Sequence, residues 1–304
     1  MKNVALVKEL NALVSLVDEP NEEMFSVIKQ KILTFGKLAI PILEDTWVDT
    51  FSDFGSKRIE SIIEEIRQEV LITEFTQWAH GANNDIITGL TILTNYFQHE
   101  VIEANYITVF EKLSRDTWLE LNDNLTALEK IRVVNHVFYT VYKFTAELEG
   151  IAKSDTYFLN KILSSRTGNA MSLGILYIAI AQKLNIPVYG VELPGHFVLV
   201  YMDDDGSLRS PDEFNELDVI FYINAAKDGT AFTRNEIVQY IHQMKLDENP
   251  DFFMPCTNLA VLKRMIGEFI ISLELENKHE KTVALKKLLT EVHQKNNLPE
   301  SASI

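Results

Sequence analysis

The sequence predicts an α+β protein, and three patterns along its 304 residues support this class. Apolar residues recur every three or four positions through the first half of the chain, which is the period of a helix. Residues 171–184 are apolar on all sides except in the last turn, as in a helix enclosed by protein. Residues 188–193 and 197–202 are short apolar runs rich in β-branched and aromatic side chains, which are typical of strands.

The N-terminal part is predicted to be entirely helical. The first helix covers Val4–Val17, and Pro20 follows its end. A second helix has its apolar face between Phe25 and Phe35, and Gly36 ends it. The helix, the glycine and the Ala39-Ile40-Pro41 step that follows resemble one unit of a HEAT-type hairpin. Further helices are predicted at residues 59–78, 83–97, 104–113 and 125–142.

The pattern changes near residue 150 and indicates a compact core. Pro187 ends the buried helix, and a third strand is predicted at Val219–Ile223 before a turn at Lys227-Asp228-Gly229. One buried helix and a small antiparallel sheet make an α+β unit. Helical periodicity returns at residues 258–273 and 281–292. We therefore expect three segments: a helical region at 1–125, the core at 126–245 and a helical tail at 246–304.

Charge and composition exclude several classes of function. The chain has 44 acidic and 28 basic side chains and a formal charge of -16, which disfavours contact with nucleic acid and with anionic membranes. No stretch is apolar and long enough to span a bilayer, and the first residues do not resemble a secretory signal. Its histidines follow no metal-binding spacing, and no phosphate-binding or dinucleotide glycine pattern occurs. We expect a cytoplasmic protein with no metal and no cofactor.

The order of elements in the core is that of a thiol active site. Papain-like folds place a cysteine at the N-terminus of a buried helix, where the helix dipole lowers the thiol pKa. A histidine on a facing strand takes the proton, and an amide or carboxylate orients the histidine. Here His196 is on the second strand and Asn224 is at the end of the third, but the helix begins at Ala170.

Residues from about Leu128 to Asp228 resemble the transglutaminase-like domain of the bacterial SirB family, which is also fused to some eukaryotic F-box proteins. The resemblance is carried by LEKIRVVNHVFY at 128–139, by residues 157–197 with their RTGN and PGHF motifs, and by FYINAAKDG at 221–229. It implies a papain/transglutaminase-like core, a helical region before it and, in many members, a tetratricopeptide-like tail after it. Carried over residue by residue, it assigns the nucleophile position to Ala170, the base to His196 and the orienting group to Asn224.

Four other residues have two interpretations each. Ser172 is either a capping hydroxyl of the first helical turn or a replacement nucleophile, although two positions along a helix turn a side chain to about the opposite face. Cys256, the single thiol, is either a packing residue or a reactive group. Arg166 and Asn169 form either a turn with an N-cap or a site for an anionic group at the helix N-terminus.

Two functions follow from these alternatives. The first is a transglutaminase-like protein that has lost its catalytic cysteine and acts as a non-catalytic binding or regulatory scaffold for another protein or a peptide. The second is a hydrolase or acyl transferase that uses His196 with Ser172 or with an external nucleophile. The sequence leaves the oligomeric state open.

Overall fold

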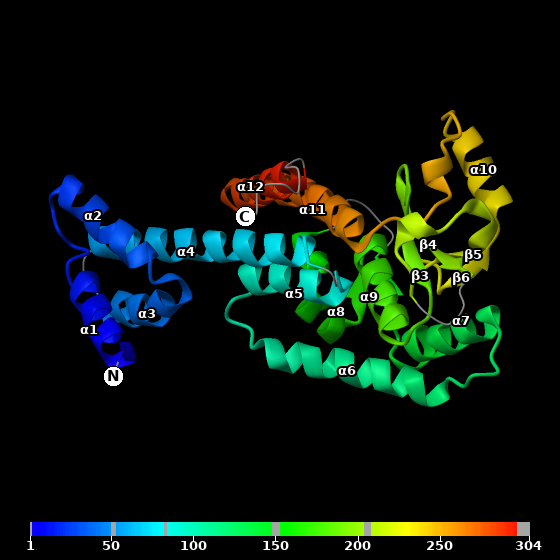
Figure 1. The fold of residues 1–304 in the computed structure, drawn as a ribbon, viewed down its shortest axis with the longest axis horizontal. Helices are drawn as coiled ribbons and strands as arrows, with labels where there is room; N and C mark the ends of the chain where they lie inside the picture. Colours follow the sequence, from blue (N-terminus) through cyan, green and yellow to red (C-terminus); the bar gives the residue numbers. More distant parts are fainter. Residues whose placement is uncertain (1, 50–52, 82–83, 148–152, 204–207, 297–304) are drawn as a thin grey trace, which may run out of the picture. The chain divides into compact units, whose positions relative to one another are not determined.

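The computed structural model describes residues 2–49, 53–81, 84–147, 153–203 and 208–296 (Figure 1). Its α+β architecture, mostly helical with small sheets, confirms the predicted fold class. The chain forms two compact units, Met1–Thr76 and Gln77–Ile304. The three segments expected from the sequence, with boundaries at 125 and 245, stay predictions. None of the helices in the described part of the chain has the length and hydropathy needed to cross a membrane.

The first unit consists of helices around a single apolar core. The side chain of Asn21 accepts hydrogen bonds from two backbone N–H groups of α2 and so caps that helix. The core is formed by buried aliphatic side chains such as Leu10, Ile32, Leu43 and Ile62. The helices are α1 (Lys2–Val14), α2 (Glu22–Leu33), α3 (Ala39–Asp49) and α4 (Asp53–Ala79), whose last three residues belong to the second unit.

Arg58 of α4 is the one buried arginine among the described residues, and it fixes the turn between α1 and α2. Its Nη1 donates to the carbonyl oxygens of Val17 and Glu19, at 3.0 Å and 2.6 Å. Its guanidinium lies between the rings of Phe25 and Phe54, 3.7 Å and 4.0 Å from their centroids. A residue that is only 7% exposed therefore donates to two backbone carbonyl oxygens that have no partner within a helix.

The second unit contains the remaining helices. The predicted helix at 125–142 is helical throughout its central part but changes from α to π geometry at His136. Two helices, α8 and α10, were not predicted from the sequence. The α-helices of this unit are α5 (Ile86–Phe97), α6 (Glu103–Glu120), α7 (Ala127–Asn135), α8 (Leu159–Ser165), α9 (Ala170–Lys183), α10 (Arg234–Gln243), α11 (Asn258–Leu275) and α12 (His279–Asn296), and the π-helical segment is His136–Val141.

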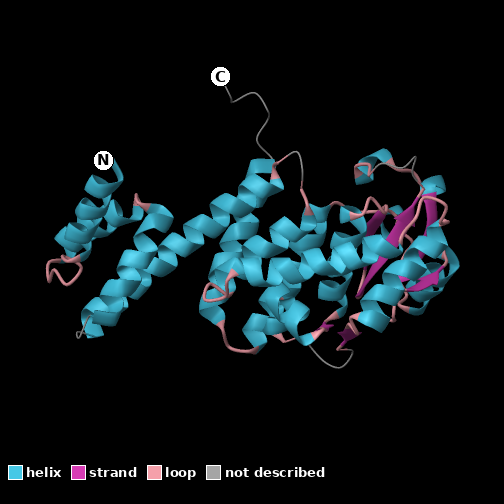
Figure 2. Ribbon diagram, turned by 90° about the horizontal axis from the view of Figure 1, so that it is seen from below, coloured by secondary structure: helices cyan, strands magenta, loops and turns pink. Residues whose placement is uncertain are grey.

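A four-stranded antiparallel sheet lies among these helices (Figure 2). Its strands, in spatial order, are β3 (Val188–Leu193), β4 (His196–Met202), β5 (Val219–Asn224) and β6 (Thr230–Phe232). The first three confirm the predicted strands, whereas β6 was not predicted. Two further short strands, β1 (Thr145–Ala146) and β2 (Thr167–Gly168), form a separate parallel pair. Strand β2 lies directly before α9 in the sequence.

The two faces of the sheet pack against different helices. On one face, Phe197 and Leu199 contact α9 at Gly174, where an added Cβ would lie 2.6 Å from the Phe197 ring. On the other face, alternate residues of the strands join Ile237 of α10 and Phe253 in one apolar cluster. The alternation of side chains along each strand thus separates the α9 face from the α10 face.

Candidate functional site

The N-terminus of α9 is built around Asn169, which is 7% exposed. Its Oδ1 accepts a hydrogen bond from the backbone N–H of Ser172 at 2.8 Å, and its Nδ2 donates to Oγ1 of Thr156 at 2.9 Å. Asn169 is therefore an N-cap whose amide is hydrogen-bonded at both ends. Ala170, the first residue of the helix, is partly exposed and presents only a methyl group.

Ser172 is fully buried within the first turn of α9. Its hydroxyl donates to the carbonyl oxygen of Asn169 at 3.2 Å. An added Cβ at Gly168 would lie 2.7 Å from this hydroxyl, so β2 closes over it tightly. The hydroxyl thus faces β2 and the helix cap and is not exposed to solvent.

His196 is exposed on a turn that the C-terminal part of the chain holds. Nη1 and Nη2 of Arg264, on α11, donate to the carbonyl oxygens of Leu193 and His196 at 3.2 Å and 2.9 Å. Tyr240 of α10 donates its hydroxyl to Pro194 O at 2.7 Å, and its ring meets the His196 imidazole edge to face at 4.7 Å. The backbone that carries His196 is therefore fixed by groups from two later helices.

Asn224, the last residue of β5, begins the turn to β6. Its Oδ1 accepts from the backbone N–H of Ala226 at 3.0 Å, so the amide oxygen is used within the turn. Within the described chain, no hydrogen bond joins the Asn224 side chain to the imidazole of His196. The amide thus stabilises its own turn in this arrangement.

Ala170, His196 and Asn224, called here the triad positions, nevertheless lie at one end of the core. Strands β4 and β5 are antiparallel with Leu199 opposite Ile223, which puts His196 and Asn224 at the same end of the two strands. Gly174, one turn after Ala170, packs on the residue that follows His196. The start of α9, the start of β4 and the end of β5 carry these positions, and packing brings the three elements to the same end, whereas the assignment of a triad to them stays a prediction.

A second network, which was not predicted from the sequence, holds the turn after Asn224. The Tyr177 hydroxyl donates to Oδ1 of Asn135 at 2.7 Å, and Nδ2 of Asn135 donates to the carbonyl oxygen of Gly229 at 2.9 Å. Tyr139 donates its hydroxyl to Ala225 O at 2.7 Å. Burial raises the pKa of Tyr139 and of Tyr177, so both phenols stay protonated and act as donors.

Arg166 lies next to β2 with a left-handed backbone, φ 63°. Its guanidinium is 5.1 Å from the ring centroids of Tyr142 and Phe144, and burial lowers its pKa. Its Nη1 is buried and has no hydrogen-bond partner among the described residues, which exclude 148–152. A role for Arg166 and Asn169 in binding an anionic group stays a prediction.

Cys256 lies beside β3 and not at the triad positions. Its thiol donates to the carbonyl oxygen of Gly190 at 3.2 Å. Burial, together with the negative charge of Glu192, raises the pKa of the thiol to about 12, and the nearby charge of Arg264 opposes this only in part. Because the thiolate is the reactive form, Cys256 is a poor nucleophile at neutral pH.

Four residues of the site were missed from the sequence: Asn135, Tyr139, Tyr240 and Arg264. Asn135 and Tyr139 fall within the segment 128–139 that carries the family resemblance. Their polar groups stand among the apolar residues of that segment, which is a signal that could have identified them. The other two donate to backbone carbonyl oxygens 46 and 71 residues away in sequence, and a single sequence contains no signal for such contacts.

The transglutaminase-like superfamily matches residues 104–267, more than half of the chain. Protein SirB1 of Salmonella typhimurium is 29% identical over 121 residues, 38% of this chain and 45% of that protein. A UPF0162 protein of Pasteurella multocida is 35% identical over 80 residues, 26% and 30% of the two chains. F-box only protein 21 of Mus musculus is 26% identical over 139 residues, 45% of this chain and 21% of that protein.

The match thus covers less than half of the length of each of these relatives. No solved structure matches the chain. The family match spans α6 to α11 and so contains all three triad positions and the residues that hold their turns. By this match, and by its buried helix and antiparallel sheet, the chain belongs to the transglutaminase-like superfamily and is similar to SirB1 proteins.

Proposed function

We propose that this protein is a non-catalytic member of its superfamily that binds or regulates another protein or a peptide. The observation that carries the proposal is Ala170 as the first residue of α9, where the family resemblance puts the nucleophilic cysteine. A methyl group has no lone pair with which to attack a carbonyl carbon. The end of the core is retained as a folded surface, but its covalent chemistry is lost.

Neither of the two remaining candidates replaces the missing thiol. The Ser172 hydroxyl is 0% exposed and donates to a backbone carbonyl, so an acyl group cannot reach it without opening of β2. The Cys256 thiol has its pKa raised to about 12 and hydrogen-bonds to Gly190. Both groups therefore support a structural role over a catalytic one.

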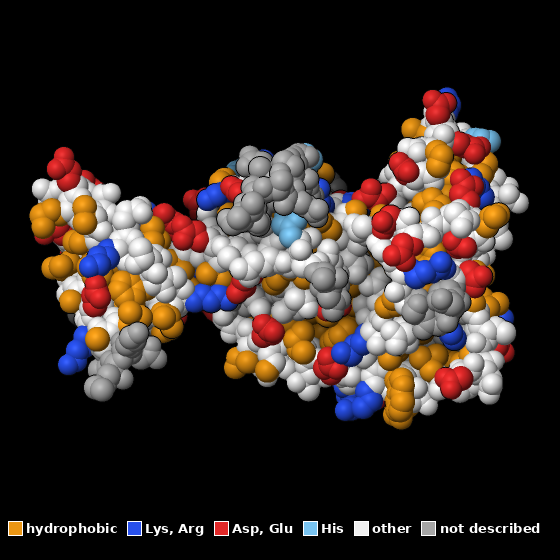
Figure 3. All heavy atoms as spheres, in the orientation of Figure 1, with side chains coloured by type: hydrophobic (Ala, Val, Ile, Leu, Met, Phe, Trp, Pro, Cys, Tyr) orange, Lys and Arg blue, Asp and Glu red, His pale blue; other side chains and the backbone are white. Residues whose placement is uncertain are grey.

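The charge of the surface supports a partner with basic side chains. Asp and Glu side chains, with some Lys or Arg side chains among them, gather over α10 and β4 on the face shown in Figure 3. The His196 turn contacts α10 through Tyr240. A peptide or protein segment rich in lysine or arginine would be steered toward this surface, and the association rate would fall as salt is added.

Labelling with acyl probes distinguishes the proposal from a hydrolase or acyl transferase. We expect neither a fluorophosphonate, directed at serine, nor a chloroacetamide, directed at thiols, to modify residues 160–202 of the folded chain. Mass spectrometry of the intact protein and of its peptides measures this directly. Stoichiometric labelling that disappears in both Ser172→Ala and His196→Ala would overturn the proposal.

Restoring the thiol should restore its reactivity if the site keeps the geometry of its relatives. In a Cys256→Ala background, we expect Ala170→Cys to react with iodoacetamide at pH 7 faster than the natural Cys256 by on the order of a hundredfold. The new thiol lies in the first turn of α9, where the helix dipole stabilises a thiolate. The pH dependence of the rate gives its pKa, expected below about 7.5.

The matched control is Ser164→Cys in the same background, because Ser164 is exposed and lies outside the helix start. Its thiol should titrate near the ordinary value of about 8.5. Adding His196→Gln to Ala170→Cys should raise the pKa of the thiol toward this value. Identical titrations of the two cysteines would show that the nucleophile position has lost its electrostatic environment as well as its sulfur.

A further inference from the structure

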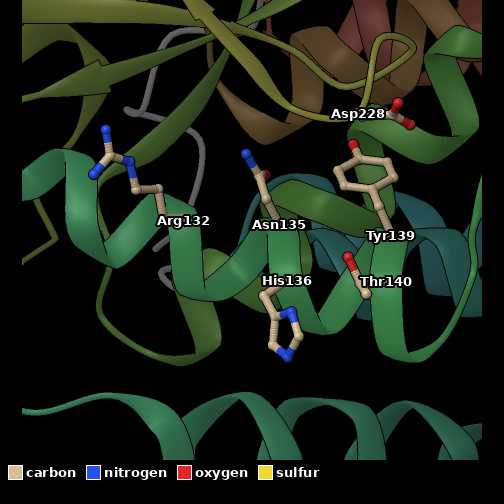
Figure 4. Close-up of a pocket in the computed structure, with 6 residues that line it drawn as sticks. All are labelled: Arg132, Asn135, His136, Tyr139, Thr140 and Asp228. Carbon is tan, nitrogen blue, oxygen red and sulfur yellow. The ribbon is translucent and has the colours of Figure 1, made fainter.

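A polar cavity of about 340 Å³ lies on the other side of the turn that follows Asn224. It is formed by α7 with its π-helical continuation and by Asp228 of the β5–β6 turn (Figure 4). In Figure 4, Arg132 and Asp228 lie toward opposite sides of the view, with Asn135 and Tyr139 between them. Its volume is in the range of small-molecule sites. The lining residues are Arg132, Asn135, His136, Tyr139, Thr140 and Asp228.

The middle of this cavity is rigid. Asn135 donates to Gly229 O, and Tyr139 donates to Ala225 O, so the side chains tie the helix to the turn that faces it. The π-helical segment begins directly after Asn135, and such segments are frequent at functional sites. The separation between the helix and the turn is therefore fixed before any ligand arrives.

The two ends of the cavity, in contrast, carry charged side chains with no bonded partner, although the charge of Arg132 also helps to lower the pKa of Glu129 on the same helix. Arg132 and Asp228 are both exposed, and neither side chain forms a hydrogen bond or an ion pair with any residue that the structure describes. The Asp228 carboxylate is close enough to Tyr139 to contribute to the raised pKa of that phenol. A fixed polar floor thus separates a free guanidinium from a free carboxylate.

A second cavity of about 260 Å³ shows the opposite pattern. It is lined in part by Glu111, Ser114 and Lys183. Lys183 and Glu111 form an ion pair at 2.8 Å, and Ser114 donates to a backbone carbonyl of its own helix. Its one carboxylate is thus paired with its one lysine, and the remaining charge, Arg115, has no free carboxylate opposite it among the lining residues.

We propose that the cavity between α7 and the β5–β6 turn binds a small zwitterion. A carboxylate of the ligand pairs with Arg132, whose planar guanidinium can donate two parallel hydrogen bonds. An ammonium group of the ligand pairs with Asp228. The chain that joins them crosses Asn135 and Tyr139, and the Thr140 hydroxyl supplies a further donor or acceptor. Binding at this cavity does not require the triad positions to be catalytic.

A series of ω-amino acids tests this site, because chain length sets the separation of the two charges. Binding of glycine, 4-aminobutyrate and 6-aminohexanoate to the full chain is measured by calorimetry at low salt. We expect saturable binding with a preferred length, at least about tenfold tighter than glycine, which corresponds to about 1.4 kcal/mol. Hexanoate and hexylamine, which carry one charge each, should bind at least about tenfold more weakly than the preferred zwitterion.

Variants at the two ends separate the contributions. Arg132→Gln removes the partner of the ligand's carboxylate, so the zwitterion should then bind no more tightly than hexylamine. Asp228→Asn removes the partner of the ammonium group, so the zwitterion should then bind no more tightly than hexanoate. Lys130→Gln and Lys227→Gln, at neighbouring positions that do not line the cavity, are the matched controls and should keep the affinity. Absence of saturable binding, equal binding of hexanoate and zwitterion, or equal losses in the control variants would each overturn the proposal.

Discussion

Gly229→Ala is expected to lower the free energy of unfolding of the unit 77–304 by about 3 kcal/mol. Gly229 has φ 66°, and an added Cβ would lie 2.0 Å from Oδ1 of Asn135. The new methyl group would displace the amide that joins Tyr177 to the turn, leaving the buried Tyr177 hydroxyl without its acceptor. Backbone strain, the clash and the lost hydrogen bonds act in the same direction.

Gly36→Ala is the matched control for the backbone strain alone. Gly36 has φ 53°, similar to Gly229, but an added Cβ would meet no atom within 4 Å beyond its own chain neighbours. We expect a loss of about 1 kcal/mol there, confined to the unit 1–76. Urea unfolding gives the total loss, and hydrogen exchange followed by mass spectrometry assigns it to a unit. Equal losses at the two glycines would contradict the contact between Gly229 and Asn135.

Arg58→Met should destabilise the unit 1–76 by about 3 kcal/mol. Methionine keeps the apolar contacts with Phe25 and Phe54 but loses every hydrogen bond of the guanidinium. The carbonyl oxygens of Val17 and Glu19 are then left without their donor. The 2.7 Å ion pair between Arg58 and Glu22 is lost as well. Helix α2 should exchange its amide hydrogens faster, while the β3–β6 sheet keeps its protection.

Arg67→Met, farther along the same helix, is the control for loss of charge. The Arg67 side chain is 17% exposed and forms a 2.7 Å ion pair with Glu44, a side chain that is 46% exposed. Because such partly solvated pairs contribute little, a loss below about 1 kcal/mol is expected. If the two substitutions lower the free energy of unfolding by the same amount, the burial of Arg58 between two rings does not explain how it stabilises the unit.

Much of the fold could be predicted because its elements have strong local patterns. The apolar run at 171–184 and the three strands around His196 and Asn224 lie where periodicity and turn residues put them. The strand β6, Thr230–Phe232, is only three residues long, which is too short to show the alternation of apolar and polar residues that predicts a strand. The change to π geometry after Asn135 was also missed, because the apolar spacing of 125–142 fits one continuous helix.

The candidate site could be predicted only in part. The positions of Ala170, His196 and Asn224 followed from their places at the ends of one helix and two strands, together with the family resemblance. The groups that fix their backbones could not be found in this way. Arg264 and Asn135 bind main-chain oxygens, which every residue has, so the sequence does not indicate which turn they contact.

After α10 the chain returns to β3, and this contact affects how readily the sheet associates with other molecules in solution. The backbone N–H of Cys256 donates to Gly190 O at 2.8 Å, which occupies the middle of the outer edge of β3. Open edges of apolar strands recruit strands from other molecules and lead to aggregation, whereas β6 at the opposite edge is very short. The segment around Cys256 therefore protects the sheet from self-association, and a chain that ends before it would lose solubility even where its core still folds.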